Sequence, residues 1–298
     1  RLHALDPVEQ ATLGAVTNFS STLALGDVKR YRFDVTQGQV VSLELLSAGS
    51  VNAVASLEGP AVTGGASTGD LTLPAPRYNT SPALFVQQNG FADLVVFSAS
   101  RYQGYATGPI TARIHAPTPV PSTLGATIAT TLNRGELKTY GYVAAAGSHL
   151  LCVKELNGAI AGIDAHVWGP APNTANGDLG TLTFSSFMEF VGPLRAGANT
   201  LSLLTGGDTA LTINARLVNL VAPTALTLSA VASTGTVTAC ERDYFSFAGV
   251  AGQAYTVRVT AAFAGDVRVR KLAADGDYTQ RIGGGSFEDN LGATPLAL

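Results

Sequence analysis

Apolar and polar residues alternate in short stretches along this chain, and glycines separate the stretches. Residues 31–36 alternate before Gly38, and residues 41–45 alternate after it. A period of two predicts a strand with one face on a core and the other in solvent, where Ser42 and Glu44 would lie. Because glycine supplies the positive φ of a tight turn, each such block predicts a β-hairpin.

This block occurs three times. Each copy has two aromatics one residue apart and, five residues after the second, a glycine: Tyr31, Phe33 and Gly38; Tyr140, Tyr142 and Gly147; Phe245, Phe247 and Gly252. The glycines are 109 and 105 residues apart (147 − 38 and 252 − 147). That spacing is the size of a β-sandwich rather than of a solenoid repeat. In the second copy the unbroken apolar run 150–153 suits a strand covered on both faces.

Further agreements place the domain boundaries. Gly59-Pro60 and Gly169-Pro170 mark equivalent turns in copies one and two, and the strand-like stretches 110–114 and 211–217 each run into a proline-containing joint. No long segment shows a helical apolar period, so the prediction is all-β: tandem antiparallel sandwiches of jelly-roll or immunoglobulin-like type. The expected domains are 13–118, 122–221 and 224–298. The segment 1–12 precedes them, and Asp6-Pro7-Val8-Glu9 within it has the signature of a helix start.

The third copy is short. Copy one runs 78 residues beyond its glycine (116 − 38), whereas only 46 residues follow Gly252 (298 − 252). One interpretation is that the chain is a piece of a longer protein or that copy three is simply smaller. The other is that a neighbouring chain donates a strand, since an incomplete sandwich leaves an unpaired edge that accepts one.

The arrangement resembles the bacterial pre-peptidase C-terminal domain family, small β-sandwiches appended to secreted enzymes and surface proteins. The resemblance rests on the aromatic pair, the polar gap, the Gly-Gln turn (Gly38-Gln39 and Gly252-Gln253) and the amphipathic strand that follows. It covers most of copies one and two and half of copy three. It implies a fold and an extracellular bacterial setting, and it does not imply an activity.

Composition narrows the function classes. Charged residues make up 13% of the chain and the net charge is −3, against about 25% charged residues in a typical soluble domain. So few Lys and Arg residues leave no basic stripe for a nucleic acid and no polybasic cluster for an anionic membrane. No apolar stretch is long enough to span a membrane. Such a surface suits an extracellular protein, or one whose outer faces are buried in an assembly.

The candidate catalytic and metal-binding motifs are weak. Residues 65–69 match Gly-x-Ser-x-Gly, but no helix is expected after them and a flexible surface loop is the favoured interpretation. Asp164 and His166 would share a strand face, as an ordinary surface pair. The acidic stretches 275–277 and 288–290 are expected to be solvated turns rather than calcium ligands. The four histidines show no metal-ligand spacing: His3, His115, His149 and His166. We therefore expect no catalytic residue, cofactor or metal.

Three further features leave alternatives open. Trp168 either packs against a domain joint or stacks on a sugar. Cys152 and Cys240 either form a disulfide between two domains or remain separate thiols. Asn18 and Asn79 begin glycosylation sequons, which carry sugar only if the host glycosylates.

The sequence thus favours a non-catalytic extracellular or cell-surface protein: a surface-layer component, filament subunit or adhesive stalk that self-associates into a homo-oligomer or polymer. One alternative is an accessory substrate-binding or spacer region of a secreted hydrolase. Another is a carbohydrate-binding module that binds a polysaccharide.

Overall fold

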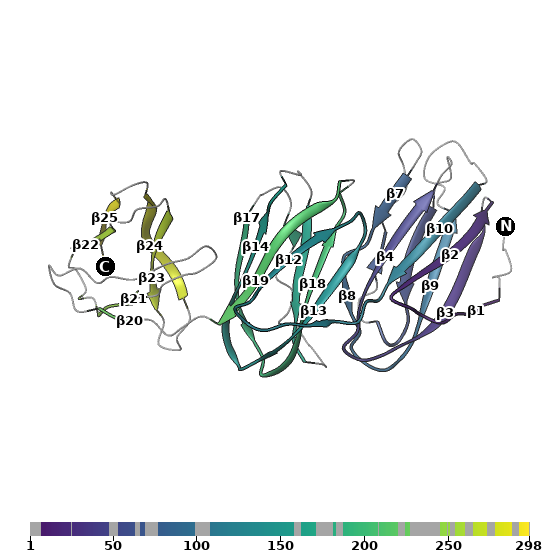
Figure 1. Cartoon of the computed structure of the whole chain (residues 1–298), viewed down its shortest axis with the longest axis horizontal. Coiled ribbons are helices and arrows are strands. Elements are labelled where there is room, and N and C mark those ends of the chain that lie inside the picture. Colours follow the sequence, from purple (N-terminus) through teal and green to yellow (C-terminus); the bar gives the residue numbers. More distant parts are fainter. Residues whose placement is uncertain are drawn as a thin grey trace. The chain divides into compact units, whose positions relative to one another are not determined.

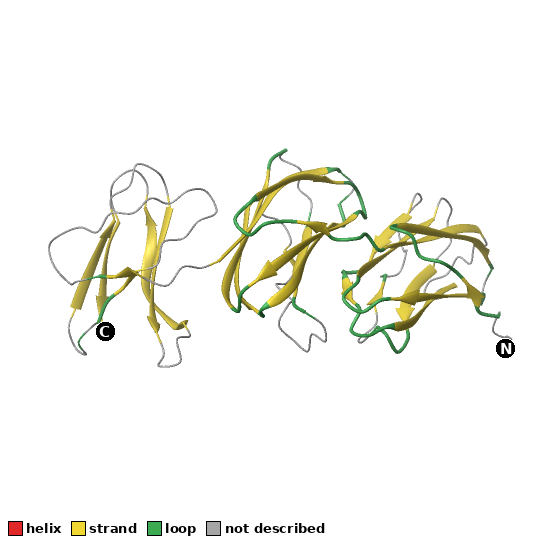
Figure 2. Ribbon diagram, turned by 60° about the horizontal axis from the view of Figure 1, so that its bottom comes forward, coloured by secondary structure: helices red, strands yellow, loops and turns green. Residues whose placement is uncertain are grey.

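The computed structural model consists of strands and loops wherever the chain is described (Figures 1 and 2). Those residues are 7–24, 26–47, 53–62, 66–68, 77–98, 108–157, 162–170, 181–182, 187–207, 209–219, 224–226, 245–248, 250, 254–259, 265–272, 278–287 and 292–297. They contain no helix and their sheets are mainly antiparallel, which confirms the all-β prediction. The chain divides into two compact units, Arg1–Leu220 with Thr238–Arg242, and Val221–Val237 with Asp243–Leu298.

The first unit begins with two sheets that we call the first sandwich. One sheet has the order β1-β3-β9-β5-β6, and the other has the order β2-β10-β4-β7, with β8 also pairing with β4. Their bounds are β1 (Glu9–Gln10), β2 (Val16–Leu23), β3 (Val28–Val35), β4 (Val40–Ser47), β5 (Ala53–Glu58), β6 (Ala66–Ser67), β7 (Arg77–Thr80), β8 (Leu84–Phe85), β9 (Gly90–Ser98) and β10 (Gly108–His115).

The second sandwich repeats this topology. Its sheets have the orders β11-β13-β18-β15-β16 and β12-β19-β14-β17. Their bounds are β11 (Val120–Pro121), β12 (Thr127–Leu132), β13 (Leu137–Ala144), β14 (Gly147–Glu155), β15 (Ile163–Trp168), β16 (Thr181–Leu182), β17 (Phe187–Leu194), β18 (Gly197–Thr205) and β19 (Leu211–Asn219).

The second unit contains three strand pairs, β20-β21, β22-β25 and β23-β24. Their bounds are β20 (Thr224–Ala225), β21 (Phe245–Ser246), β22 (Ala254–Val259), β23 (Gly265–Leu272), β24 (Tyr278–Phe287) and β25 (Gly292–Ala297). β22 is the amphipathic strand expected after the third glycine. Gly252 itself lies outside the described residues, and the incompleteness of this copy remains a prediction.

One pairing marks the repeat in all three copies. A two-residue strand runs parallel to the first aromatic strand each time: Glu9 opposes Tyr31, Val120 opposes Tyr140, and Thr224 opposes Phe245. The helix expected near Asp6 is absent at Glu9 and Gln10, which form β1. The outer edge of β3 offers backbone partners that a helix start would leave unused, and the Ala11 N–H donates to the Arg32 carbonyl at 2.8 Å.

The hairpin prediction is wrong in one respect. Gly38 does sit in a turn, with φ +85°, whereas Gly147 is the first residue of β14 and has φ +149°. However, β3 pairs with β1 and β9, whereas β4 pairs with β10, β7 and β8. The turn therefore carries the chain from one sheet to the other, and β13 and β14 are related in the same way. An alternating pattern fixes which side chains face the core, but it does not fix the neighbouring strand.

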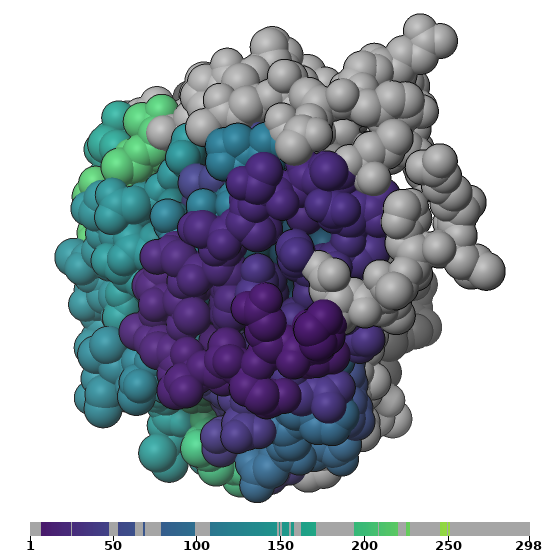
Figure 3. All heavy atoms as spheres, turned by 90° about the vertical axis from the view of Figure 1, so that its right-hand side faces the viewer, coloured from purple at the N-terminus to yellow at the C-terminus, as the bar shows by residue number. Residues whose placement is uncertain are grey.

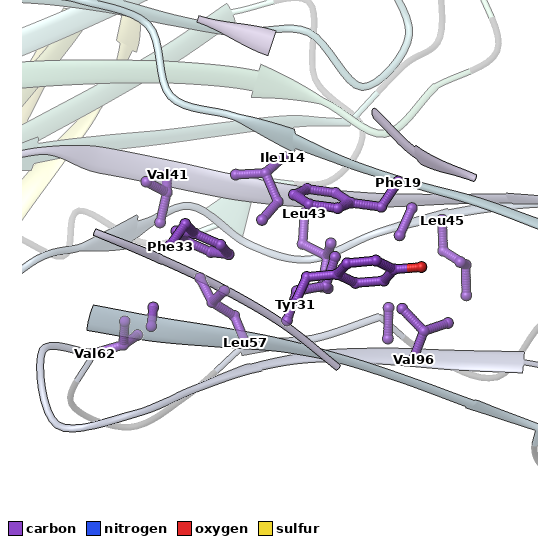
Figure 4. Packing of buried hydrophobic residues seen from close by; sticks show 14 of the residues in the cluster. Phe19, Tyr31, Phe33, Val41, Leu43, Leu45, Leu57, Val62, Val96 and Ile114 are labelled. Carbon is purple, nitrogen blue, oxygen red and sulfur yellow. The ribbon is translucent and has the colours of Figure 1, made fainter. Parts of the chain in front are cut away.

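Each sandwich has its own apolar core. In the first, aromatics from β2 and β3 meet aliphatic side chains from both sheets (Figure 4). The ring centroids of Phe19 and Tyr31 are 4.7 Å apart, and Phe33 is 1% exposed. In the second, Tyr142 is 2% exposed and takes the place of Phe33. The aromatic pairs that define the repeat therefore fill the cores.

Tyr142 makes the second sandwich sensitive to alkali. Burial, with a smaller contribution from Tyr140, raises the pKa of the Tyr142 phenol to about 12. In the unfolded chain the phenol ionises near pH ~10. Above that pH the unfolded state releases a proton that the folded state keeps, so stability falls as pH rises. Urea titrations from neutral to strongly alkaline pH should show a shallower decline for Tyr142→Phe than for the natural protein, and equal slopes would contradict this assignment.

Candidate functional site at the junction of the two sandwiches

The first and second sandwiches share a small apolar cluster, which we call the junction cluster. It combines side chains that lie at one end of the first sandwich with side chains on the outer face of β13 and β18: Val40, Ala83, Phe85, Leu137 and Leu204. Each is at most 6% exposed. The outer face of this sheet is therefore covered at Leu137 and Leu204 rather than solvated.

Trp168 packs against the junction cluster. Its ring stacks on Phe85 with a centroid separation of 5.6 Å and an interplanar angle of 13°. Its Nε1 donates a hydrogen bond to Ser202 Oγ at 2.8 Å. Of the two uses expected for this tryptophan, the structure has the packing at a domain joint.

Asp164 and His166 lie beside Trp168 on β15. His166 Nε2 is 2.5 Å from Asp164 Oδ1, and the imidazole stacks on the Trp168 ring with centroids 5.0 Å apart. The expectation of an ordinary surface pair is wrong, because His166 is only 4% exposed. Residues two apart do share a strand face, but here that face is the one that meets the first sandwich.

These residues have the composition of a catalytic triad without its geometry. Ser202 on β18 is directly opposite His166 in the ladder. Its hydroxyl accepts the Trp168 hydrogen bond, the serine is wholly buried, and the His166 Nε2 faces Asp164. A triad instead requires the histidine nitrogen that faces the nucleophile to be available as a base, and a substrate must reach the hydroxyl. The arrangement packs Trp168, His166 and Ser202 together at the joint.

A second group of polar residues, the Glu44 cluster, consists of Glu44, Arg113 and His115. It lies on the outer face of the sheet β2-β10-β4-β7 of the first sandwich. Glu44 Oε2 accepts a hydrogen bond from Arg113 Nη1 at 2.6 Å and is 3.2 Å from His115 Nε2. Glu44 and its neighbour Ser42 are 1% and 3% exposed, so the expectation that they face solvent is wrong. Sequence reasoning missed this cluster, although an acid inside the apolar run 40–46 was a usable signal.

Gly135 of the second sandwich covers Glu44. Its φ is +68°, and a Cβ added there would lie 2.8 Å from Glu44 Cδ. Glycine is required at this position twice over, by the backbone conformation and by the close approach. The β12–β13 turn thus seals a carboxylate that would otherwise meet water.

The outer face of β3 and β9 carries a third charged group. Asp93 accepts hydrogen bonds from Arg32 Nε and Nη2 at 2.7 and 2.9 Å and from Arg30 Nη2 at 3.0 Å. The Arg32 guanidinium also lies 3.9 Å from the centroid of the Phe91 ring. Hydrogen bonding by Arg32 holds the pKa of the Asp93 carboxyl below its ordinary value.

Asp93 should contribute an acid-dependent share of the stability of the first sandwich. A carboxyl whose pKa is lower when folded stabilises the protein above its unfolded pKa, near ~3.9, and this contribution disappears as pH falls through the folded value. Asp93→Asn should cost about 1 kcal/mol at neutral pH, a modest figure because both arginines remain partly exposed to water. In urea titrations the deficit should vanish at strongly acid pH; a deficit independent of pH would show that amide packing, not charge, is responsible.

A groove opens at one edge of the first sandwich, between β2 and the pair β1 and β3. It has a volume of about 600 Å³ and is lined mainly by polar side chains, among them Glu9, Thr17, Asn18, Ser20 and Lys29. Figure 3 looks onto the purple N-terminal strands that form this region. In the described sheet β2 is the end strand, so one row of its backbone groups faces outward from the sheet.

Two further predicted motifs, the Gly-x-Ser-x-Gly match and the sequon at Asn18, can be located in the structure. Ser67 of the Gly-x-Ser-x-Gly match lies in β6 opposite Ser56, and Thr68 is 1% exposed and bonded to Ala55, so the expected flexible loop is wrong at these residues. Asn18 is exposed on β2, and its Oδ1 accepts a hydrogen bond from Arg113 Nε at 2.8 Å.

Cys152 forms a disulfide and is wholly buried. Leu151 and Val153 are buried beside it, which confirms the expected strand covered on both faces. His3, Cys240 and the acidic stretches 275–277 and 288–290 lie outside the described residues. Within the described ranges no cluster of His, Cys, Asp and Glu is arranged to hold a metal, and no helix long and apolar enough to span a membrane is found.

Comparison with known proteins adds no relative: no family model matches this chain, and no curated protein is significantly similar to it.

Proposed function

We propose that this chain is a non-catalytic, extracellular structural protein that self-associates through strand edges, as a surface-layer component, filament subunit or adhesive stalk. The observation that carries the proposal is the junction. Glu44 lies under Gly135 of the second sandwich, and Trp168, which stacks on His166, also stacks on Phe85 of the first sandwich. Buried contacts of this kind favour a rigid pair of sandwiches over two flexibly linked ones.

The edge of the first sandwich supports self-association. β2 is an eight-residue end strand whose pattern is largely hydroxyl and amide side chains, and Val16 at its start is 52% exposed. An extended segment that added to β2 would gain main-chain hydrogen bonds and would lie along the groove beside β1. The disulfide at Cys152 supports an oxidising compartment, since structural disulfides persist mainly outside the cytosol.

The test is the assembly state of the natural protein and of one edge variant. Electron microscopy and sedimentation velocity of the purified natural chain should show a regular polymer. Thr22→Lys places a charge on the exposed end strand and should abolish the polymer, because lysine on an edge disfavours strand addition. Thr111→Lys, on the central strand β10 of the same sheet, is the matched control and should leave assembly intact. A strictly monomeric natural protein, or equal effects of both lysines, would refute the proposal.

The carbohydrate-binding alternative depends on an accessible aromatic. Trp168 is engaged with Phe85 and Ser202, so we expect Trp168→Ala to loosen the junction without changing retention on a polysaccharide column. Retention by the natural chain that this variant abolishes, while its thermal transition is unchanged, would instead favour a sugar site.

A further inference from the structure

The buried disulfide lies on the outer face of the second sandwich. Leu151 and Val153 face the core on either side of Cys152, so its side chain points to the opposite face of β14, and yet it is 0% exposed. Cys152 is disulfide-bonded, and the chain has only one other cysteine, Cys240. Something must therefore cover this outer face at the position of Cys152.

The strand register shows which residue of the first sandwich corresponds to Cys152. Glu44 on β4 is opposite Arg113 of β10, and it lies between the core residues Leu43 and Leu45. Cys152 on β14 is opposite Arg216 of β19, between Leu151 and Val153. Because β4 and β14 hold the same place in the two sandwiches, Glu44 and Cys152 are equivalent positions.

The partners of these two residues are equivalent as well. Gly135, which covers Glu44, lies five residues before Tyr140 (140 − 135), the aromatic that pairs with the short parallel strand β11. Cys240 lies five residues before Phe245 (245 − 240), the aromatic that pairs with β20. The segment Thr238–Arg242 also groups with the first unit, although the residues on both sides of it belong to the second.

We propose that the disulfide joins Cys152 to Cys240 and that it is the covalent version of the contact between Glu44 and Gly135. In each case a residue five positions before the first aromatic of the next copy reaches the same outer-face position of the preceding sandwich. At the first junction this contact is a glycine over a buried carboxylate. At the second position it is a bond between the side chains of Cys152 and Cys240. The inference stands independently of self-association.

Formation of the disulfide is a two-electron oxidation. Two thiols lose two protons and two electrons to a thiol oxidant of an oxidising compartment, and one S–S bond forms. A dithiol reductant returns both electrons and restores the thiols. Reduction should therefore break the link between Cys152 and Cys240 and leave the junction of the first and second sandwiches, which contains no cysteine, intact.

Peptide mapping of the full chain tests the pairing. Digestion with trypsin without reductant should give one linked species made of residues 139–154 and 217–242, the peptides that contain the two cysteines. Dithiothreitol should separate it into its two halves. Recovery of alkylated thiols on the unreduced protein, or a dimer of the 139–154 peptide, would overturn the proposal.

Engineered cysteines test whether Glu44 and Gly135 are equivalent to Cys152 and Cys240. Glu44→Cys with Gly135→Cys should form a second disulfide during oxidative refolding, because these positions correspond to Cys152 and Cys240. Ser42→Cys with Gly135→Cys is the matched control, two residues away on the same strand face, and should remain reduced. A soluble folded Glu44→Cys/Gly135→Cys protein that stays reduced, or equal bridging by the control, would contradict the shared geometry. The peptide map of the natural protein identifies the cysteine pairing even if the double variant fails to fold.

Discussion

Phe33→Ala should lower the free energy of unfolding of the first sandwich by about 3–5 kcal/mol, the cost of removing a fully buried aromatic and leaving a cavity. Phe33 is 1% exposed, and its ring centroid lies 6.4 Å from that of Phe19 (Figure 4). Residues on both sheets surround it, since Val41 and Leu57 belong to the same cluster. The loss therefore affects the contact between the two layers and not one strand alone.

Urea unfolding followed by circular dichroism measures this effect. Val16→Ala is a suitable control, because Val16 lies in the same sandwich but is 52% exposed, and truncating it should cost less than about 0.5 kcal/mol. Phe33→Leu, which keeps most of the apolar volume, should lose less than the alanine variant. A Phe33→Ala cost no larger than that of the control would show that the aromatic repeat does not define the core.

The sequence predicted the strands well because the core needs apolar side chains at every second position. Tyr31 and Phe33 could be assigned to a core-facing strand from spacing alone, and both are buried. Which strand lies beside them could not be assigned. A hairpin and a crossing between sheets place the same residues inward, and the choice depends on β9, more than fifty residues away along the chain.

The polar face of β4 shows why the junction could not be predicted. Ser42 and Glu44 occupy positions that meet water in an isolated sandwich, and the alternation is correct for such a domain. Both are buried, and at Glu44 the turn at Gly135 of the next sandwich lies over the side chain. Contacts between repeats leave no period in the sequence. Trp168 is a partial exception, since a lone tryptophan beside a Gly-Pro turn did indicate a joint.

Glu9 and Gln10 illustrate a local signal that tertiary structure overrides. The Asp-Pro-x-Glu pattern favours a helix start, but a helix here would leave the outer edge of β3 without backbone partners. The parallel pairing of β1 with Tyr31 and Arg32 satisfies that edge instead. The same pairing recurs at Val120 in the second sandwich, where no helix signature precedes it, so the edge and not the local sequence determines the conformation.

Arg113→Met should lower the free energy of unfolding of the first sandwich by about 3–5 kcal/mol, because it leaves the buried Glu44 carboxylate without its main ionic partner. Arg113 Nη1 is 2.6 Å from Glu44 Oε2, and the Glu44 side chain is 1% exposed. Gly135 lies against this carboxylate from the second sandwich. The variant should weaken the junction as well as the first sandwich, which thermal unfolding would register as an earlier and broader transition.

A double-mutant cycle separates the charge from the packing. Glu44→Gln removes the buried charge, so adding Arg113→Met to it should cost clearly less than Arg113→Met alone, with a coupling of about 1–3 kcal/mol. Arg216→Met is the matched control: it lies at the equivalent position of β19, opposite Cys152 rather than an acid, and its Nε donates to the Gly125 carbonyl at 2.7 Å. It should cost less than Arg113→Met, about 1.5–3 kcal/mol, the value of a hydrogen bond made by a charged group. Additive costs in the cycle, or an Arg216 effect as large as that of Arg113, would mean that the carboxylate does not need its arginine and that the junction is held by the apolar cluster alone.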